Sequence, residues 1–288
     1  MARTALAGAT FAAISLPRLS EAKRAPAGGR LVDTNVTLMQ WPMRRLPLDE
    51  SEVLARTLLE HHVVEAWACS FEALLQPDLT AVNNRLARAC KSAPRNLFIP
   101  FGAINPARTR WREDLRRCAD EHKMPGIRLY PNYHGYTLND AACADLFAEC
   151  AGRGLIVQIA ATLEDVRVQH PRMKCDPVDL KPLPGALAHA PGLKLVLLNW
   201  NRALNSKIAL SLAAEGKAWV DMATQEGVAG ISNLLRQAPR NAVLFGSHAP
   251  FYYFESALLK LRESELTADE LEAIRFGNAG NVKRTHSI

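Results

Sequence analysis

The sequence predicts an α/β fold, a single (β/α)8 barrel followed by one additional C-terminal helix. Short apolar, β-rich segments alternate with helical segments from residue 30 onward, and eight such units fit in the chain. Alternating strands and helices favour a parallel sheet, and eight units favour closure of that sheet into a barrel. A doubly wound open sheet is the structural alternative. No glycine-rich nucleotide-binding motif follows the first strand, and this absence counts against the open sheet.

The eight expected strands are short runs of apolar and β-branched residues. They cover 30–38, 63–69, 96–105, 126–132, 154–160, 193–200, 217–223 and 242–248. Helices are expected in the segments between and after them, at 51–62, 83–93, 110–123, 138–153, 184–190, 203–216, 228–238 and 253–263. A terminal helix is expected within 267–282, because Thr267 suits an N-cap and Asp269 and Glu270 suit a first helical turn.

The composition fits one globular domain. A barrel of this class needs about 250 residues, and the chain has 288, of which 48% are hydrophobic. The net charge of +6 comes from Lys and Arg scattered over polar helix faces, without a stripe of aromatic and basic residues. We therefore expect no nucleic-acid partner. The six cysteines form no CxxC pair, which favours reduced thiols and a reducing compartment.

The N-terminal segment indicates a different location. Arg3 precedes the apolar run 4–16, and small residues before Lys23 resemble a signal-peptide cleavage site. The run is too short to cross a bilayer, so stable membrane insertion is not expected. Export to the periplasm and a cytoplasmic location both stay open, as does cleavage of residues 1–22. We divide the chain into a signal-like segment and linker at 1–29 and a barrel domain at 30–288.

Polar side chains gather at the carboxyl ends of the expected strands, where barrels of this class build their active sites. Side chains alternate between the two faces of a strand, and this alternation selects those that point inward. The loop 161–177, long enough to be functional, follows the fifth strand on the same face, whereas His134 is expected on a surface loop. The candidates are Asp33, Asn35, Arg128, Tyr130, Gln158, Asn199 and His248 on strands, with Arg167 and His170 in the loop.

Several sequence runs resemble the amidohydrolase-related (amidohydrolase 2 type) family of the metal-dependent hydrolase superfamily over about residues 30 to 282. The resemblance is carried by VDTNVTL, FGAINP, GIRLYPNYHGYTLND (126–140), PGLKLVLLNW (191–200), VLFGSHAPF (243–251) and IRFGNAGNV (274–282). It implies a (β/α)8 barrel that hydrolyses or decarboxylates a small substrate, commonly with one divalent metal ion.

The resemblance also implies that most metal-ligand positions are substituted. Asp33 matches the first position of the family's first-strand motif, and Asn35 replaces the histidine that follows it. The histidines of the fifth and sixth strands fall at Ala160 and Asn199, and the aspartate of the eighth strand falls at His248. A zinc site usually needs at least three His, Asp, Glu or Cys ligands. We therefore predict no metal ligands and no tightly bound zinc. A divalent metal is implied by the resemblance alone.

The leading functional hypothesis is a hydrolase, lactonase-like or amidohydrolase-like, that acts on a small carboxylate-bearing substrate. His248 would be the base and Asp33 would orient it or the attacking water, because an imidazole suits proton transfer near neutral pH. Arg128 would bind the negative charge of the substrate. The alternative is a degenerate, non-catalytic barrel that binds a small ligand or a protein partner, and a homo-oligomer is compatible with both. The first test is whether Asp33, Asn35, Arg128, Asn199 and His248 converge.

Overall fold

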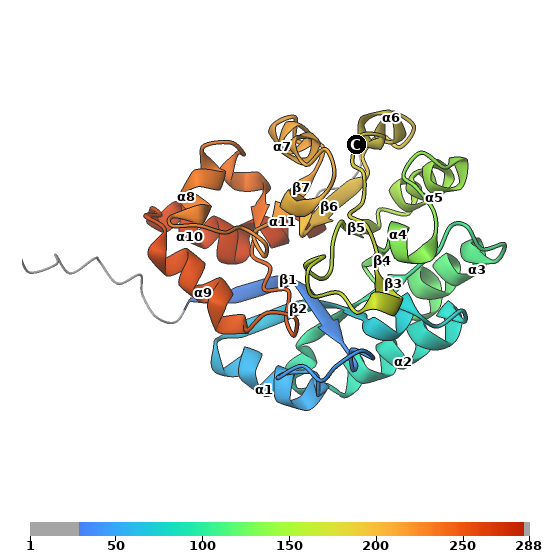
Figure 1. Cartoon of the computed structure of the whole chain (residues 1–288), viewed down its shortest axis with the longest axis horizontal. Helices are drawn as coiled ribbons and strands as arrows, with labels where there is room; N and C mark the ends of the chain where they lie inside the picture. The colour runs from blue at the N-terminus through green and yellow to red at the C-terminus, as the bar shows by residue number, and fades with distance from the viewer. Residues whose placement is uncertain (1–28, 285–288) are drawn as a thin grey trace, which may run out of the picture.

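The computed structural model describes residues 29–284, which form a (β/α)8 barrel with an additional C-terminal helix, as the sequence predicts (Figure 1). Eight parallel strands follow one another around the barrel in chain order. They are β1 (Leu31–Leu38), β2 (Val63–Ser70), β3 (Phe98–Ala103), β4 (Gly126–Leu129), β5 (Ile156–Ala160), β6 (Lys194–Leu198), β7 (Trp219–Asp221) and β8 (Val243–Leu244).

The last strand returns to the first. Val36 of β1 forms a parallel bridge with Ala249, and Thr34 N donates to Phe245 O over 2.9 Å. Strand β1 itself is irregular, because its register against β2 shifts between Asp33 and Val36. Simple alternation of side chains therefore does not run through the middle of β1.

Most of the helices form the outer ring of the barrel (Figure 1). The helices are α1 (Ser51–Glu60), α2 (Leu79–Ser92), α3 (Trp111–Arg116), α4 (Pro131–His134), α5 (Ala141–Gly152), α6 (Leu183–Ala188), α7 (Lys207–Ala214), α8 (Gly230–Leu235), α9 (Phe254–Glu263), α10 (Ala268–Glu272) and α11 (Asn278–Arg284). The short α4 was not expected. Pro131 suits its first turn, and Gly135, with a φ of 70°, ends it in a left-handed conformation.

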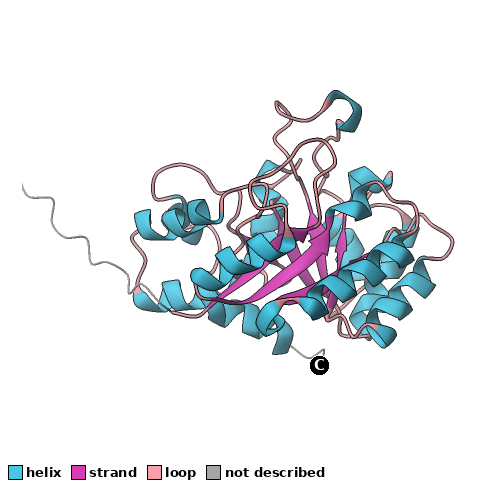
Figure 2. Cartoon of the chain, turned by 90° about the horizontal axis from the view of Figure 1, so that it is seen from below, coloured by secondary structure: helices cyan, strands magenta, loops and turns pink. Residues whose placement is uncertain are grey.

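The C-terminal segment closes the amino-terminal end of the barrel. Thr267 caps α10 through a reciprocal pair of hydrogen bonds with Glu270, which confirms the predicted cap. Ala279 and Val282 of α11 pack against Val32 and Val196 of the barrel interior. Loops project from the opposite end, which is the mouth (Figure 2).

The six cysteines all carry free thiols, and five of them are buried. Among residues 29–284, no helix has the length and apolar character needed to cross a membrane. The signal-like segment 1–29 lies, apart from Gly29, outside the described residues.

Candidate functional site

Arg128 and Gln158 form a polar layer inside the barrel. The Arg128 guanidinium donates to Gln158 Oε1 at 2.8 Å, to Val36 O at 3.0 Å, to Thr37 Oγ1 at 3.3 Å and to Trp67 O at 3.1 Å. Gln158 Nε2 in turn donates to Thr34 O over 2.8 Å. Arg128 thus ties β4 to β1, β2 and β5, and these four bonds occupy most of its donors.

A network of two amides and one carboxylate lies at the carboxyl ends of β1, β6 and β7. Asn35 Nδ2 donates to Asn199 Oδ1 at 3.0 Å and to Asp221 Oδ2 at 2.7 Å. The second oxygen of Asp221, Oδ1, accepts from Asn199 N over 2.8 Å. All three side chains are buried, so their hydrogen bonds to one another replace the hydrogen bonds that water would make.

Asp221 is a site residue that the sequence reasoning missed, because no residue of the seventh strand was considered. The available signal was an acidic residue at the carboxyl end of an apolar strand, where burial is costly without a partner. Gly246 makes room for it. A Cβ at position 246 would lie 2.8 Å from Asp221 Oδ2 and 3.1 Å from Asn35 Cβ.

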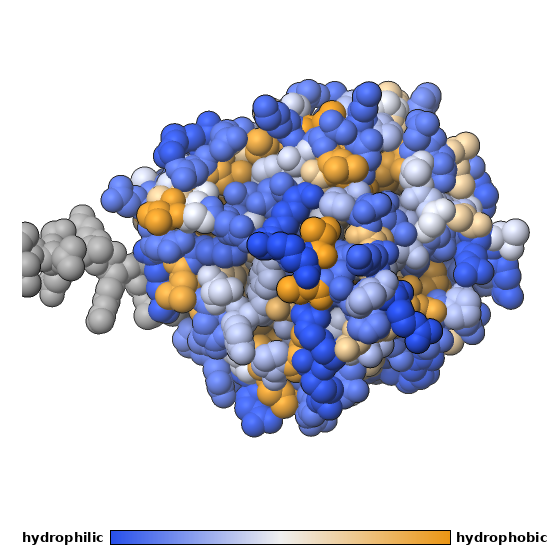
Figure 3. Space-filling model, in the orientation of Figure 1, coloured by the Kyte–Doolittle hydropathy of each residue, from blue (hydrophilic) through white to orange (hydrophobic). Residues whose placement is uncertain are grey.

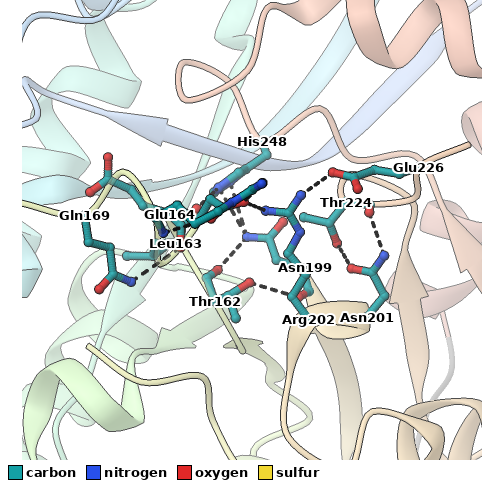
Figure 4. Close-up of polar contacts among 12 residues, drawn as sticks. Thr162, Leu163, Glu164, Gln169, Asn199, Asn201, Arg202, Thr224, Glu226 and His248 are labelled. Atoms are coloured by element: carbon teal, nitrogen blue, oxygen red, sulfur yellow. Dashed lines mark hydrogen bonds and ion pairs between the residues drawn. The ribbon is translucent and has the colours of Figure 1, made fainter. Parts of the chain in front are cut away.

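His248 joins this network from the segment after β8 (Figure 4). Its Nε2 lies 2.7 Å from Leu163 O, and its Nδ1 lies 3.3 Å from Asn199 Nδ2. Because a carbonyl oxygen only accepts, Nε2 carries the proton and Nδ1 accepts from Asn199. Both ring nitrogens are therefore engaged, and the Asn199 amide is held further by Thr162 O at 2.8 Å.

Asp33 lies beside the network and differs from Asp221 in one respect. Its Oδ1 accepts from Asn35 N at 3.1 Å and from Ser247 N at 3.0 Å, while its Oδ2 is buried without a hydrogen-bond partner. Asp33 has no solvent exposure. Of the five residues expected to converge, Asn35, Asn199 and His248 are in direct contact, Asp33 reaches them through the Asn35 backbone, and Arg128 lies in the neighbouring layer.

Burial separates the proton affinities of these groups. Desolvation raises the pKa of Asp33 to about 7, against hydrogen bonds from Ser247 and Asn35 that lower it, and the negative charge of Asp221 makes a smaller contribution to the rise. Desolvation also raises the pKa of Asp221, to about 6, against hydrogen bonds from Asn35 and Asn199 that lower it. The pKa of His248 is lowered to about 4 by burial. Near neutral pH, His248 is therefore uncharged, and Asp33 keeps its proton to a higher pH than Asp221 does.

The donor set does not fit a transition-metal ion. Ala160 has no side-chain ligand atom, the Asn35 and Asn199 side-chain amides are bonded to each other, and the Asn35 amide also donates to Asp221. Among the described residues, no group of three His, Cys, Asp or Glu side chains is placed to hold a metal ion. Zinc and related ions require such a set, so we derive no chemistry through a metal here.

Apolar side chains from the loops cover the mouth. Trp41, Phe71 and Phe251 form a mutual cluster with ring centroids 5.0–5.4 Å apart, and the Phe251 ring lies 5.1 Å from that of His248. Arg44 forms an ion pair with the buried Glu164 and so links the loops after β1 and β5. In the space-filling view, side chains cover the axis and most of this face is hydrophilic (Figure 3).

A narrow crevice of about 10 Å³ opens beside this cover. Tyr133, Thr162, Glu164 and Cys175 are among its lining residues, which do not include Asp33 or His248. Tyr130 is buried in the apolar cluster at the mouth. Neither of the loop candidates joins the network: Arg167 pairs with Asp165, and His170 Nδ1 accepts from Arg172 N over 3.2 Å.

Comparison with solved structures finds the same fold at low sequence identity. A 2,6-dihydroxybenzoate decarboxylase from Rhizobium matches with a TM-score of 0.68 and 12% identity, covering 90% of this chain and 99% of that one. A dihydroxybenzoic acid decarboxylase from Polaromonas sp. JS666, with bound manganese and the inhibitor 2-nitroresorcinol, gives 0.66 and 13%, with coverages of 90% and 97%. A 4-oxalomesaconate hydratase from Rhodopseudomonas palustris gives 0.63 and 16%, with coverages of 88% and 95%.

No curated protein sequence matches the chain. The sequence model described as amidohydrolase matches residues 37–282, which is most of the chain and nearly the whole barrel. The chain therefore belongs to the amidohydrolase family, in its amidohydrolase 2 branch.

Proposed function

We propose that this protein is an acid–base hydrolase that acts at the barrel axis on a small carboxylate-bearing ester or amide, lactones included, without a zinc ion. The observation that carries the proposal is the buried Asp33 carboxyl group, which has an unpartnered Oδ2 and a pKa of about 7. A general acid–base group works best when its pKa lies near the operating pH. Asp33 fits this role better than His248, whose ring nitrogens are both engaged.

In the proposed reaction, ionised Asp33 takes a proton from a water molecule, and the water oxygen attacks the substrate carbonyl carbon. The C–O or C–N bond of the tetrahedral intermediate then breaks, and Asp33 returns the proton to the leaving oxygen or nitrogen. Burial, and to a smaller extent the charge of Asp221, keeps the proton affinity of Asp33 high. His248 and Asn199 are positioning residues that hold the network together.

Arg44 is the better candidate than Arg128 for binding the substrate carboxylate. Arg128 is buried and holds four protein acceptors. Arg44 is half-exposed at the mouth, and its present partner is itself a carboxylate, Glu164. A substrate carboxylate that replaces Glu164 would therefore keep the Arg44 charge paired while releasing the loop after β5. The contact is one for which a guanidinium is suited.

The test is a screen of lactones, esters and amides with purified protein, with and without a chelator. On a confirmed substrate, Asp33→Asn should lower kcat by about two to four orders of magnitude, and the pH–rate profile of the wild type should show a group near pH 7. Asp145→Asn, on the exposed side of α5, is the matched control and should leave the rate unchanged. Full turnover by Asp33→Asn would remove Asp33 from the mechanism.

A second candidate is a barrel that binds a ligand without catalysis. The mouth is covered, and the crevice beside it is not lined by Asp33 or His248. Most donors of the Arg128 guanidinium are already bonded within the protein. Both observations favour binding without catalysis. Saturable binding of a carboxylate that the wild type does not turn over, and whose affinity is lost in Arg44→Gln, would support this alternative over the hydrolase.

A further inference from the structure

We propose that a second pocket, formed by the loops that follow β2, β3 and β4, binds a small organic carboxylate, with Arg108 and Asn105 holding the carboxylate group. The pocket has a volume of about 230 Å³ and lies at the mouth end of the barrel. It is distinct from the barrel axis, since its lining includes none of Asp33, Asn199 or His248.

The polar side of this pocket is built for an anion. No acidic side chain lines it. Arg108 lies on its wall, and within residues 29–284 this guanidinium has no ion-pair partner. An Arg at a concave site without a competing carboxylate favours a planar, two-oxygen ligand.

Asn105 supplies a fixed neutral donor beside Arg108. Its Oδ1 accepts from Ala107 N at 3.0 Å, which sets the orientation of the amide. Its Nδ2 has only a long contact of 3.4 Å to His134 O, so the amide donor is weakly used within the protein. Asn105 is buried, and a buried amide donor gains from a stronger acceptor.

His134 forms the back of the pocket and is partly buried, not the surface histidine that the sequence suggested. Its Nε2 lies 2.8 Å from Ala73 O and therefore donates, while its Nδ1 is buried without a hydrogen-bond partner. With Nε2 as the donor, Nδ1 is an acceptor and does not bind a carboxylate. His134 therefore shapes the back of the pocket, and Arg108 and Asn105 are the groups that hold the carboxylate.

Most of the pocket surface is polar, and its smaller apolar part comes from Leu74, Pro77 and Leu79 together with Leu75, which is 46% exposed. A pocket that combines a few convergent polar groups with apolar side chains is the usual form of a small-ligand site. The ligand class is thus a carboxylate on a compact apolar body, for which benzoate is a suitable probe.

A ligand-observed NMR titration with benzoate tests this assignment. Wild-type protein should bind benzoate saturably, and Arg108→Gln should weaken binding by about tenfold or more, the loss expected for a charge-assisted contact. Arg110→Gln is the matched control, because this exposed arginine is two residues away and does not line the pocket. It should change the affinity by less than about twofold. Benzyl alcohol, which lacks the charge, should bind more weakly than benzoate.

Two further variants separate this pocket from the proposed substrate site and from effects on folding. Asn105→Asp keeps an acceptor for Ala107 N and places a negative charge beside the ligand, so it should abolish binding while the thermal unfolding transition is retained. In an Arg44→Gln background, which removes the proposed substrate-carboxylate contact at the mouth, benzoate should still bind saturably and Arg108→Gln should still weaken that binding. Equal affinities in wild type and Arg108→Gln, equal losses in the Arg108 and Arg110 variants, or no saturable binding by wild type would each overturn the proposal.

Discussion

Asn35 of β1 donates its side-chain Nδ2 to Oδ1 of Asn199, which follows β6, over 3.0 Å at the centre of the barrel mouth. The two neutral side-chain amides thus hold each other, and the Asp221 carboxylate accepts from the Asn35 side chain and from the Asn199 backbone N–H. Each side chain completes the hydrogen bonding of several buried groups at once. Removal of one therefore costs more than a single hydrogen bond.

Replacing Asn199 with Ala should lower the free energy of unfolding by about 3 to 5 kcal/mol, since Asn35, His248 and Thr162 O would all lose a partner. The measurement is urea denaturation followed by circular dichroism. Part of the loss comes from the backbone, because Asn199 has a φ of 54° and Ala is strained there.

Asn205→Ala is the matched control for that backbone term. Asn205 has a φ of 55° and makes one surface hydrogen bond, to Asp179. The Asn199 variant should lose at least about 2 kcal/mol more than the Asn205 variant. Equal losses in the two variants would mean that the network adds nothing to stability.

Much of the fold could be predicted from the sequence because the strands are apolar runs separated by amphipathic helices, and Thr267 is a local capping signal. The site could be predicted only in part. The shift in β1 between Asp33 and Val36 depends on pairing with β2, which no local pattern encodes. Alternation therefore placed Asp33 and Asn35 in equivalent positions, whereas Asp33 bonds to the Ser247 backbone and Asn35 reaches Asn199.

The role of Arg128 was also beyond the sequence. Strand alternation correctly predicted that its side chain points into the barrel. Three of its hydrogen-bond acceptors, however, lie on β1 and β2, which are far from Arg128 in the sequence. The aromatic cover of the mouth could not be predicted for the same reason. Trp41, Phe71 and Phe251 come from three separate loops and meet only in the folded barrel. Side chains brought together by tertiary packing leave no periodic signal in a single sequence.

The raised pKa of Asp33 predicts a specific pH dependence of stability. The stabilising contribution of a carboxyl with a raised pKa is present below its unfolded value of 3.8 and is lost as the pH rises through about 7. The Asp33→Asn variant lacks this titrating group and does not suffer the loss. Its free energy of unfolding minus that of wild type should therefore rise by about 4 kcal/mol from pH 4 to pH 8. Because His248 and Asp221 are present in both proteins, their titration largely cancels in the difference. A difference that is flat with pH would contradict the raised pKa.

Metal analysis should find far less than one zinc ion per purified chain, because Ala160, Asn35 and Asn199 remove the ligands that such a site needs. Incubation with a chelator should leave the thermal unfolding midpoint unchanged. Near-stoichiometric zinc that the chelator removes with a fall in the midpoint would show that other side chains rearrange into a metal site.

Arg128→Lys should destabilise the barrel by about 3 kcal/mol or more, since a lysine ammonium cannot reach the acceptors on β1, β2 and β5 that the guanidinium joins. This expectation replaces the role in substrate binding that the sequence suggested. Arg112→Lys, on an exposed ion pair of α3, is the control and should change stability by less than about 0.5 kcal/mol. A fully stable Arg128→Lys variant with weakened substrate binding would restore the earlier role.

Glu164→Gln tests whether the ion pair with Arg44 holds the mouth closed. The Glu164 side chain is 2% exposed and pairs with Arg44, so the neutral amide should hold the loop after β5 less firmly. We expect faster amide hydrogen exchange in residues 161–170 and around Arg44, measured by mass spectrometry, with little change in the barrel strands. Glu226→Gln breaks a comparable ion pair with Arg202 from an exposed carboxylate and should leave that exchange unchanged.

If the proposed hydrolase activity is confirmed, Glu164→Gln should also lower KM more than it changes kcat, because the substrate carboxylate no longer competes with Glu164 for Arg44. Unchanged exchange in both loops would mean that the aromatic cluster of Trp41, Phe71 and Phe251 closes the mouth by itself.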